Sequence, residues 1–134
     1  MTAKINSILL IDDDDADNFF HTIAIKKMDN DIEIRTAENG VEALKMLNQE
    51  GSPPDLIFLD INMPKMNGWE FLQEFKKLET RFKAKAIIVM LTTSDSPEEI
   101  RQAQQTPEVV GFETKPLTTA KLKLILENHF PFQL

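Results

Sequence analysis

Apolar residues along the chain form short runs that alternate with longer amphipathic stretches. The runs predict strands at residues 5–11, 32–36, 55–59, 86–91 and 109–113. The first, third and fourth runs are almost continuously apolar, as expected of parallel strands that are covered on both faces. The pattern therefore predicts a sheet whose central strands are buried between two layers.

The stretches between these runs carry apolar residues three or four positions apart, which is the spacing of one face of a helix. In the first stretch, this spacing predicts an apolar face made of Phe19, Phe20, Ile23, Ala24 and Met28. The same spacing recurs at Val41, Leu44 and Leu47; at Phe71, Leu72 and Phe75; at Ile100 and Ala103; and at Leu122, Ile125 and Leu126.

Capping residues mark the expected starts of four helices. Asn39 and Asn67 each have a glutamate three positions later, in NGVE and NGWE. Ser96 precedes a proline and also has a glutamate three positions later, in SPEE. Thr118 opens the last helix in TTAK. Together, the patterns predict five strand–helix units in strict alternation.

Strict alternation predicts an α/β fold, a five-stranded parallel sheet with helices on both faces and right-handed crossovers. We expect a flavodoxin-like (βα)5 arrangement with strand order 2-1-3-4-5, in which the second strand lies at an edge. The 134 residues suffice for one core, so we expect a single domain over residues 1–134. In such a fold, the ligand crevice lies at the carboxyl ends of the strands.

Polar residues follow the first, third, fourth and fifth predicted strands. Asp12 and Asp13 come directly after the first strand, Asp60 after the third, Thr92 after the fourth and Lys115 after the fifth. An aspartate run alone is more often a solvated loop or the acidic first turn of a helix. The coincidence at neighbouring strand ends instead predicts a functional site at one rim of the sheet.

The residue types at this rim indicate a chemistry. Two like charges about 4 Å apart repel by about 4 kcal/mol at an effective dielectric constant near 20, so converging carboxylates need a cation. The expected donors are oxygens, with no cysteine in the chain, and this set suits Mg²⁺ completed by a phosphate oxygen. The Lys115 ammonium and the Thr92 hydroxyl can contact a phosphoryl group, and a carboxylate there can act as a nucleophile.

These residues stand in motifs that resemble the receiver domain of two-component response regulators. The resemblance covers about residues 7–130 and rests on LLIDDD, DLIFLDINMPKMNG, MLTTSD and GFETKP, in that order. It implies that Asp60 is the phosphoacceptor and that Asp12 and Asp13 bind Mg²⁺ beside it. It also implies that the backbone carbonyl of Asn62 is a further metal ligand.

The same resemblance assigns roles at the other strand ends. It implies that Thr92 is the switch hydroxyl, that Lys115 pairs with the phosphoryl group and that Phe112 is the aromatic switch residue. Phe112 lacks a phenolic hydroxyl, so the switch would act through burial and exposure of the ring. Asp14 can be a helix N-cap or a further acid near the metal, and we predict that it is the cap.

The function that follows is Mg²⁺-dependent transfer of a phosphoryl group from a phosphohistidine to Asp60. The expected donor is a sensor histidine kinase or a histidine phosphotransfer protein. The protein would be a signalling domain and not an enzyme, with an unknown downstream protein as its target. The face of the fourth helix, fifth strand and fifth helix would change and could also form a homodimer. We expect a single-domain regulator, because the chain starts at Met1 and ends soon after the fifth helix; a module of a longer multidomain regulator is the alternative.

Charge and hydropathy exclude other classes of partner. The net charge of −7 argues against a nucleic-acid surface, which needs a clustered positive field. The longest apolar run apart from the N-terminal one, AIIVML, is far too short to span a membrane. The N-terminus does not have the pattern of a secretory signal, so we expect a cytoplasmic protein that binds no membrane.

A haloacid-dehalogenase-like phosphatase is the main alternative, since that class also uses an aspartate nucleophile, Mg²⁺, a threonine and a lysine. Asp12 and Asp14 have its Asp-x-Asp spacing. That class needs acidic ligands after the lysine, however, and only Glu127 follows Lys115. It also leaves LDINMPKMNG unexplained.

Two further alternatives are weaker. An EF-hand loop starting at Asp13 would have Asn18 in place of the required glycine and Ala24 in place of the final glutamate. An interaction module without phosphorylation is disfavoured because the acceptor, switch and lysine positions are all intact.

Overall fold

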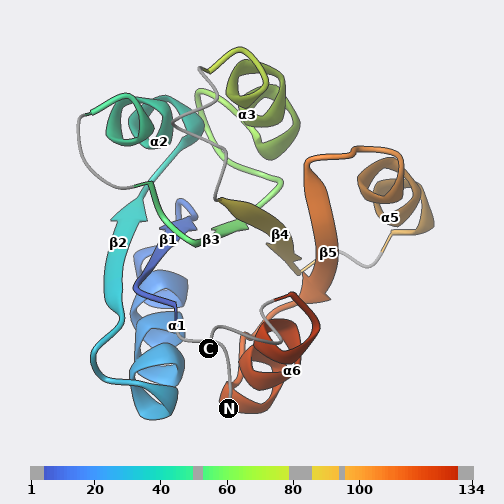
Figure 1. Cartoon of the computed structure of the whole chain (residues 1–134). Helices are drawn as coiled ribbons and strands as arrows, with labels where there is room; N and C mark the ends of the chain where they lie inside the picture. The colour runs from blue at the N-terminus through green and yellow to red at the C-terminus, as the bar shows by residue number, and fades with distance from the viewer. Residues whose placement is uncertain (1–4, 50–52, 79–85, 94–95, 130–134) are drawn as a thin grey trace.

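The computed structural model describes residues 5–49, 53–78, 86–93 and 96–129. Its five parallel strands form one sheet in the order β2-β1-β3-β4-β5 (Figure 1). The strands are β1 (Ser7–Ile11), β2 (Glu33–Ala37), β3 (Leu56–Leu59), β4 (Ile87–Thr92) and β5 (Val109–Thr114). The helices are α1 (Asp15–Met28), α2 (Gly40–Leu47), α3 (Gly68–Phe75), α5 (Pro97–Gln104) and α6 (Thr119–His129). The predicted fold class and strand order are confirmed.

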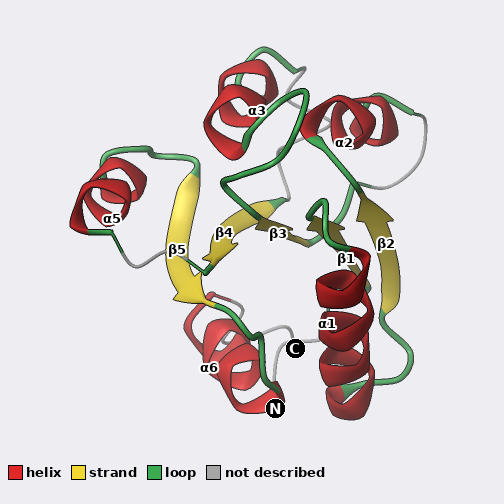
Figure 2. Ribbon diagram, turned by 180° about the vertical axis from the view of Figure 1, so that it is seen from behind, coloured by secondary structure: helices red, strands yellow, loops and turns green. Residues whose placement is uncertain are grey.

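Helices cover both faces of the sheet. Helices α1 and α6 lie on one face, and α2 and α3 lie on the other (Figures 1 and 2). Along β1, Ile8 and Leu10 pack into the core under α1 and α6. Leu9 and Ile11 pack into the second core with residues of α2, α3 and α5. Since successive side chains of a strand point to opposite faces, two cores explain why the strand runs are continuously apolar.

The predicted apolar face of α1 is partly wrong. Phe19 and Phe20 are each 62% exposed, and Ile23 is also exposed. Met28 does pack against the core, as expected. The buried residues of α1 are Asn18, His21 and Ile25. The helix is turned toward these residues in part because the Asn18 amide donates a 3.0 Å hydrogen bond to the carbonyl of Asp12, which anchors the helix to the end of β1.

The predicted helix starts agree with the structure at most positions. Asp14 caps α1, since its carboxylate accepts hydrogen bonds from two backbone N–H groups of the first turn. Asn67 forms a full capping box at α3, and Asn39 caps α2. Ser96 precedes α5 as predicted but makes no capping hydrogen bond with its side chain. None of the helices in the described ranges is long and apolar enough to span a membrane.

Candidate functional site

The candidate site begins where β1 and β3 end side by side. In the parallel register of these strands, their last residues, Ile11 and Leu59, pair with each other. The residue directly after each strand is an aspartate, Asp12 after β1 and Asp60 after β3. The backbone N–H of Asp60 donates to the carbonyl of Ile11 at 2.9 Å, and that of Asp12 donates to the carbonyl of Ala37 at 3.0 Å. The sheet therefore holds the backbones of both acids at one rim.

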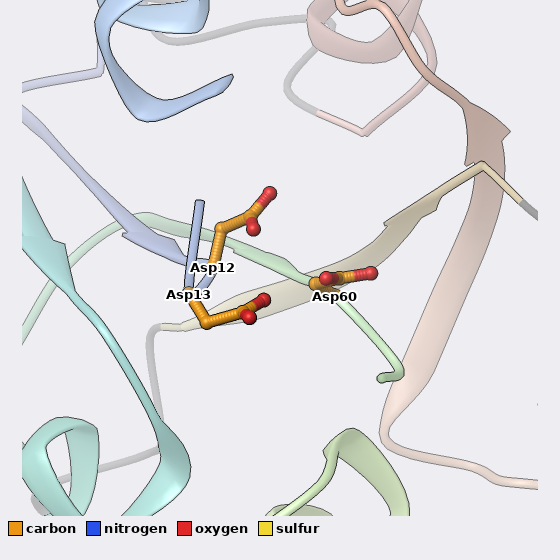
Figure 3. A group of neighbouring side chains, drawn as sticks. All are labelled: Asp12, Asp13 and Asp60. Carbon is orange, nitrogen blue, oxygen red and sulfur yellow. The ribbon is translucent and has the colours of Figure 1, made fainter. Parts of the chain in front are cut away.

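Three carboxylates meet at this rim. One oxygen from each of Asp12, Asp13 and Asp60 lies within 4.8 Å of the other two (Figure 3). Asp12 and Asp60 are buried, whereas Asp13 is exposed. Like charges at this separation repel, and the repulsion is larger where the groups are removed from water. The cluster therefore needs positive charge nearby.

Lys115 supplies one positive charge. Its ammonium lies 2.5 Å from Asp12 Oδ2, 2.7 Å from Asp17 Oδ2 and 3.6 Å from Asp60 Oδ2. The lysine follows β5, and its backbone N–H donates to the carbonyl of Thr92 at 2.8 Å, which fixes it to the end of β4. The structure thus brings the predicted acids and the predicted lysine together.

Asp17 is a member of this group that the sequence analysis missed. It stands in the first turn of α1, where acids are common because they interact favourably with the helix dipole. No local signal separates it from Asp15 in the same turn. The contact with Lys115 spans 98 positions and depends on where the end of β5 lies relative to α1.

The environment changes the protonation of Asp60. Burial raises the pKa of its carboxyl from the usual 3.8 to about 6, and the charges of Asp12 and Asp13 add to the rise. The ammonium of Lys115 and a hydrogen bond from the backbone N–H of Ile61 act in the opposite direction. Protonation near pH 6 would neutralise the negative charge that makes the carboxylate a nucleophile.

The pKa values of the two neighbouring bases, Lys115 and His21, shift in opposite directions. Burial alone would lower the pKa of Lys115, but its hydrogen bonds with Asp12 and Asp17 and the charge of Asp60 raise that pKa above its ordinary value. Burial lowers the pKa of His21, which lies beneath the site on α1. At neutral pH, Lys115 is therefore charged and His21 is neutral.

Comparison with known proteins decides the family. The family model for the response regulator receiver domain matches residues 8–127. The chain belongs to the response regulator receiver domain family. Receiver domains are signalling domains, and neither this match nor the relatives below support the haloacid-dehalogenase-like alternative.

Several relatives resemble this receiver domain over most of its length. The chemotaxis protein CheY of Halobacterium salinarum is 34% identical over 110 residues, which cover 81% of this chain and 83% of that protein. A crystal structure of a two-component response regulator from Cytophaga hutchinsonii is 36% identical, with a TM-score of 0.87 and coverage of 96% and 99% of the two chains. The phosphorylated cyanobacterial phytochrome response regulator RcpA is 32% identical, with a TM-score of 0.74 and coverage of 93% and 91%.

Other curated relatives are much longer than this receiver domain. The chain spans only 7%, 14% and 24% of three of them. Receiver domains therefore occur both in short proteins and as parts of longer ones.

The donor set of the receiver domain fits Mg²⁺. Asp12, Asp13 and Asp60 offer only carboxylate oxygens, which are hard ligands. Oxygens around one Mg²⁺ lie about 3 to 4.2 Å apart, so small side-chain rotations would bring these atoms into range. The acidic group thus has the composition of a magnesium site and a spacing close to that of one.

The remaining predicted residues lie around the acidic group. Thr92 is the last residue of β4 and is fully buried. Phe112 is half-buried on β5, where it pairs in register with Met90. Asn62 is exposed two positions after Asp60. The switch roles of Thr92 and Phe112 and the ligand role of Asn62 stay predictions.

The MPKMNG loop of the receiver domain packs tightly against Asp60. A Cβ atom added at Gly68 would lie 2.6 Å from the backbone oxygen of Asp60 and 3.0 Å from Cα of Ile61. The N–H of Gly68 also donates to the carbonyl of Ile61 at 2.8 Å. Glycine is therefore required here by close backbone contact, which gives the last position of the motif a physical role.

Proposed function

We propose that this receiver domain accepts a phosphoryl group on the carboxylate of Asp60, with Mg²⁺ held by Asp12, Asp13 and Asp60. The observation that carries this proposal is the position of the Asp60 carboxylate among two other carboxylates and the Lys115 ammonium. An aspartate held between a cation site and a lysine can attack phosphorus, because both cations neutralise charge on the phosphoryl oxygens.

The chain's own residues have separate tasks in this step. The Ile61 N–H donates to Asp60 Oδ1 at 2.8 Å and orients the carboxylate. An Asp60 oxygen forms the new bond to phosphorus as the bond from phosphorus to the donor histidine breaks, and the imidazole keeps the electron pair. The Lys115 ammonium stabilises the negative phosphoryl oxygens. Mg²⁺, when bound, supplies further neutralisation of charge.

The proposed donor is a phosphohistidine on a sensor kinase or on a phosphotransfer protein. Two curated relatives whose matching regions resemble this chain are named as histidine kinases, one from Dictyostelium discoideum and one from Helicobacter pylori. These names support a pathway in which receivers and histidine kinases act together.

We propose that the donor protein docks on α1. The exposed side chains of Phe19, Phe20 and Ile23 lie on this helix, and the two phenylalanine rings stand 5.6 Å apart between centroids. The helix starts directly after the acidic residues that follow β1. A donor histidine that reaches Asp60 must approach this rim, so an apolar surface at its border is well placed to hold the donor protein.

The proposed response to phosphorylation involves Thr92, Phe112 and the face made by α5, β5 and α6. Phe112 lines one pocket of about 490 Å³ with residues of α5 and another of about 420 Å³ with residues of α6. A change in the position of this ring would therefore alter both sides of β5. The exposed side chains of Val110 and Leu124 also lie on this face, and we propose that a second copy of the chain binds there.

We further propose that the protein acts in the cytoplasm as a signalling domain and not as an enzyme with released product. In the proposed step the phosphoryl group stays on Asp60, so the product of the reaction is the phosphorylated protein itself. We propose that it works as a single-domain regulator.

Incubation with Mg²⁺ and acetyl phosphate, followed by intact mass measurement, tests the proposal. The wild type should gain one phosphoryl group, and Asp60→Asn should gain none. Asp31→Asn removes a carboxylate from an exposed position away from the cluster and should behave like the wild type. A chelator should abolish the gain. Modification that persists in Asp60→Asn, or a wild type that is never modified, would contradict the proposal.

A further inference from the structure

The Lys115 ammonium is shared among three carboxylates, and the acceptor is the most distant of them. Asp12 and Asp17 lie at 2.5 Å and 2.7 Å, whereas Asp60 lies at 3.6 Å. A lysine ammonium has three N–H donors. Asp12 and Asp17 each lie within hydrogen-bond range of one of them, and Asp60 is at ion-pair distance only.

Asp17 stands outside the metal cluster but is held in place. Its backbone N–H donates to the capping carboxylate of Asp14 at 3.1 Å, which fixes it in the first turn of α1. Its side chain is 34% exposed, while that of Lys115 is only 8% exposed. Among the described residues, the acidic group that could hold a metal consists of Asp12, Asp13 and Asp60. The contact through which Asp17 reaches the site is therefore its ion pair with Lys115.

We propose that Asp17 is a positioning residue that holds Lys115 in the resting state and competes with the phosphoryl group on Asp60 for its ammonium. This inference rests on the proposed function of Asp60. Phosphoryl oxygens on Asp60 require N–H donors from Lys115, and one donor is engaged by Asp17 in the resting arrangement. The negative charge of Asp17 also opposes an anion bound nearby. Both effects favour the unphosphorylated state.

The direction of the effect follows from what remains when Asp17 is neutralised. Lys115 keeps its contact with buried Asp12, so it stays at the rim. The donor that the Asp17 carboxylate engages in the resting state, and more of the ammonium charge, then become available to the phosphoryl group. Because the Asp17 side chain is partly exposed and screened by water, the gain is moderate, and we expect about a threefold to tenfold change in affinity.

The test measures the binding affinity for beryllofluoride at saturating Mg²⁺. Beryllofluoride mimics a phosphoryl group on an aspartate. The lone tryptophan, Trp69, stands next to Gly68 and provides a fluorescence signal. Asp17→Asn should bind beryllofluoride about threefold to tenfold more tightly than the wild type. Asp15→Asn is the matched control, because it removes the same charge from an exposed position in the same helical turn. It should change the affinity less than twofold.

A double-mutant cycle shows whether Asp17 acts through Lys115. The initial rate of phosphorylation by acetyl phosphate, followed for hours in slow variants, is compared for Asp17→Asn, Lys115→Met and the double variant. Asp17→Asn should raise the rate more in the wild-type background than in the Lys115→Met background, where only the direct repulsion by Asp17 is relieved. An equal effect in both backgrounds would contradict action through the lysine. Asp17→Ser provides a second neutral variant if Asp17→Asn does not fold.

The outcomes separate this inference from the proposed function. If the wild type binds beryllofluoride but Asp17→Asn binds it no more tightly than Asp15→Asn does, the competition is refuted and the acceptor role of Asp60 stands. Weaker binding by Asp17→Asn would mean that Asp17 assists the phosphoryl group, which also refutes the competition. If the wild type neither binds beryllofluoride nor gains a phosphoryl group, the proposed function fails and this inference fails with it.

Discussion

The ammonium of Lys115 donates a 2.7 Å hydrogen bond to the carboxylate of Asp17, although 98 positions separate the two residues in the chain. This contact joins the first turn of α1 to the segment after β5. Since Lys115 also lies against Asp12 and near Asp60, it links the segment after β5 to the ends of β1 and β3. In this structure three carboxylates therefore share the positive charge of one lysine.

The raised pKa of Asp60 predicts a dependence of stability on pH. The Asp60 carboxyl has a pKa of about 6 in the folded protein and ordinarily 3.8, so the folded state binds more protons between these values. The folded protein therefore loses stability as the pH rises from 3.8 through about 6, and the full cost of the buried charge is present above that range. In a chelator, Asp60→Asn should raise the free energy of unfolding at pH 8 by about 1 to 3 kcal/mol. At pH 4, where Asp60 is largely protonated in the folded protein, the difference should nearly vanish.

Urea unfolding of the wild type and Asp60→Asn at both pH values measures this difference. Asp31→Asn serves as the control because Asp31 is exposed. Equal stability of Asp60→Asn and the wild type at pH 8 would show that the buried charge carries no such cost.

Binding of Mg²⁺ should stabilise the fold and depend on Asp13. This residue is exposed, so Asp13→Asn should leave stability in a chelator nearly unchanged. It replaces one of three carboxylate ligands with a neutral amide, however, and should weaken Mg²⁺ binding about tenfold or more. The rise of the melting temperature with Mg²⁺ concentration measures the affinity. Asp15→Asn should retain the wild-type response, and an unaltered response in Asp13→Asn would place the metal elsewhere.

The close contact at Gly68 predicts a costly substitution. Gly68→Ala would press a methyl group against the backbone of Asp60, so we expect a loss of about 1 to 3 kcal/mol in the free energy of unfolding. Gly111→Ala is the matched control, because the nearest atom to its added Cβ lies 3.6 Å away in ordinary contact. Urea unfolding compares the two, and a similar change in both would argue against the steric explanation.

The exposed phenylalanines of α1 predict a defect that is specific to the protein donor. The test uses a purified histidine phosphotransfer domain that phosphorylates the wild type. The double variant Phe19→Ser, Phe20→Ser should receive the phosphoryl group from this domain about tenfold more slowly or worse. Phosphorylation by acetyl phosphate should be unaffected, since this small donor needs no docking surface. Val41→Ser, on α2, removes another exposed apolar side chain and serves as the control. Equal loss with both donors would indicate damage to the site itself.

The face of α5, β5 and α6 predicts an assembly that depends on phosphorylation. Beryllofluoride and Mg²⁺ should shift the wild type from monomer toward dimer in sedimentation velocity. Leu124→Glu places a charge at an exposed apolar position on α6 and should keep the protein monomeric. A wild type that remains monomeric with beryllofluoride bound would rule out a second copy as the occupant of this face.

Local patterns predicted much of the fold and the centre of the site. Continuous runs of apolar residues located the three central strands, because a strand buried on both faces requires apolar side chains at every position. The acids after β1 and β3 were predicted to meet because parallel strands end at the same rim. The Asp14 cap followed from the preference of short polar side chains for helix starts.

The same reasoning failed where long-range contacts compete with a local pattern. Phe19 and Phe20 have the spacing of a core face, yet the buried positions of α1 include Asn18 and His21, whose polar atoms lie beneath the rim. Ser96 has the sequence of a capping serine but makes no capping hydrogen bond with its side chain.

The sequence by itself determined the alternation of strands and helices, because this depends on periodicity, and the expected flavodoxin-like topology then placed Asp12, Asp13, Asp60 and Lys115 at one rim. Only the tertiary structure decided which face of α1 is buried and that Asp17 contacts Lys115. Those relations depend on how a helix is turned against the sheet and on side chains far apart in the chain, and neither leaves a repeating signal along it.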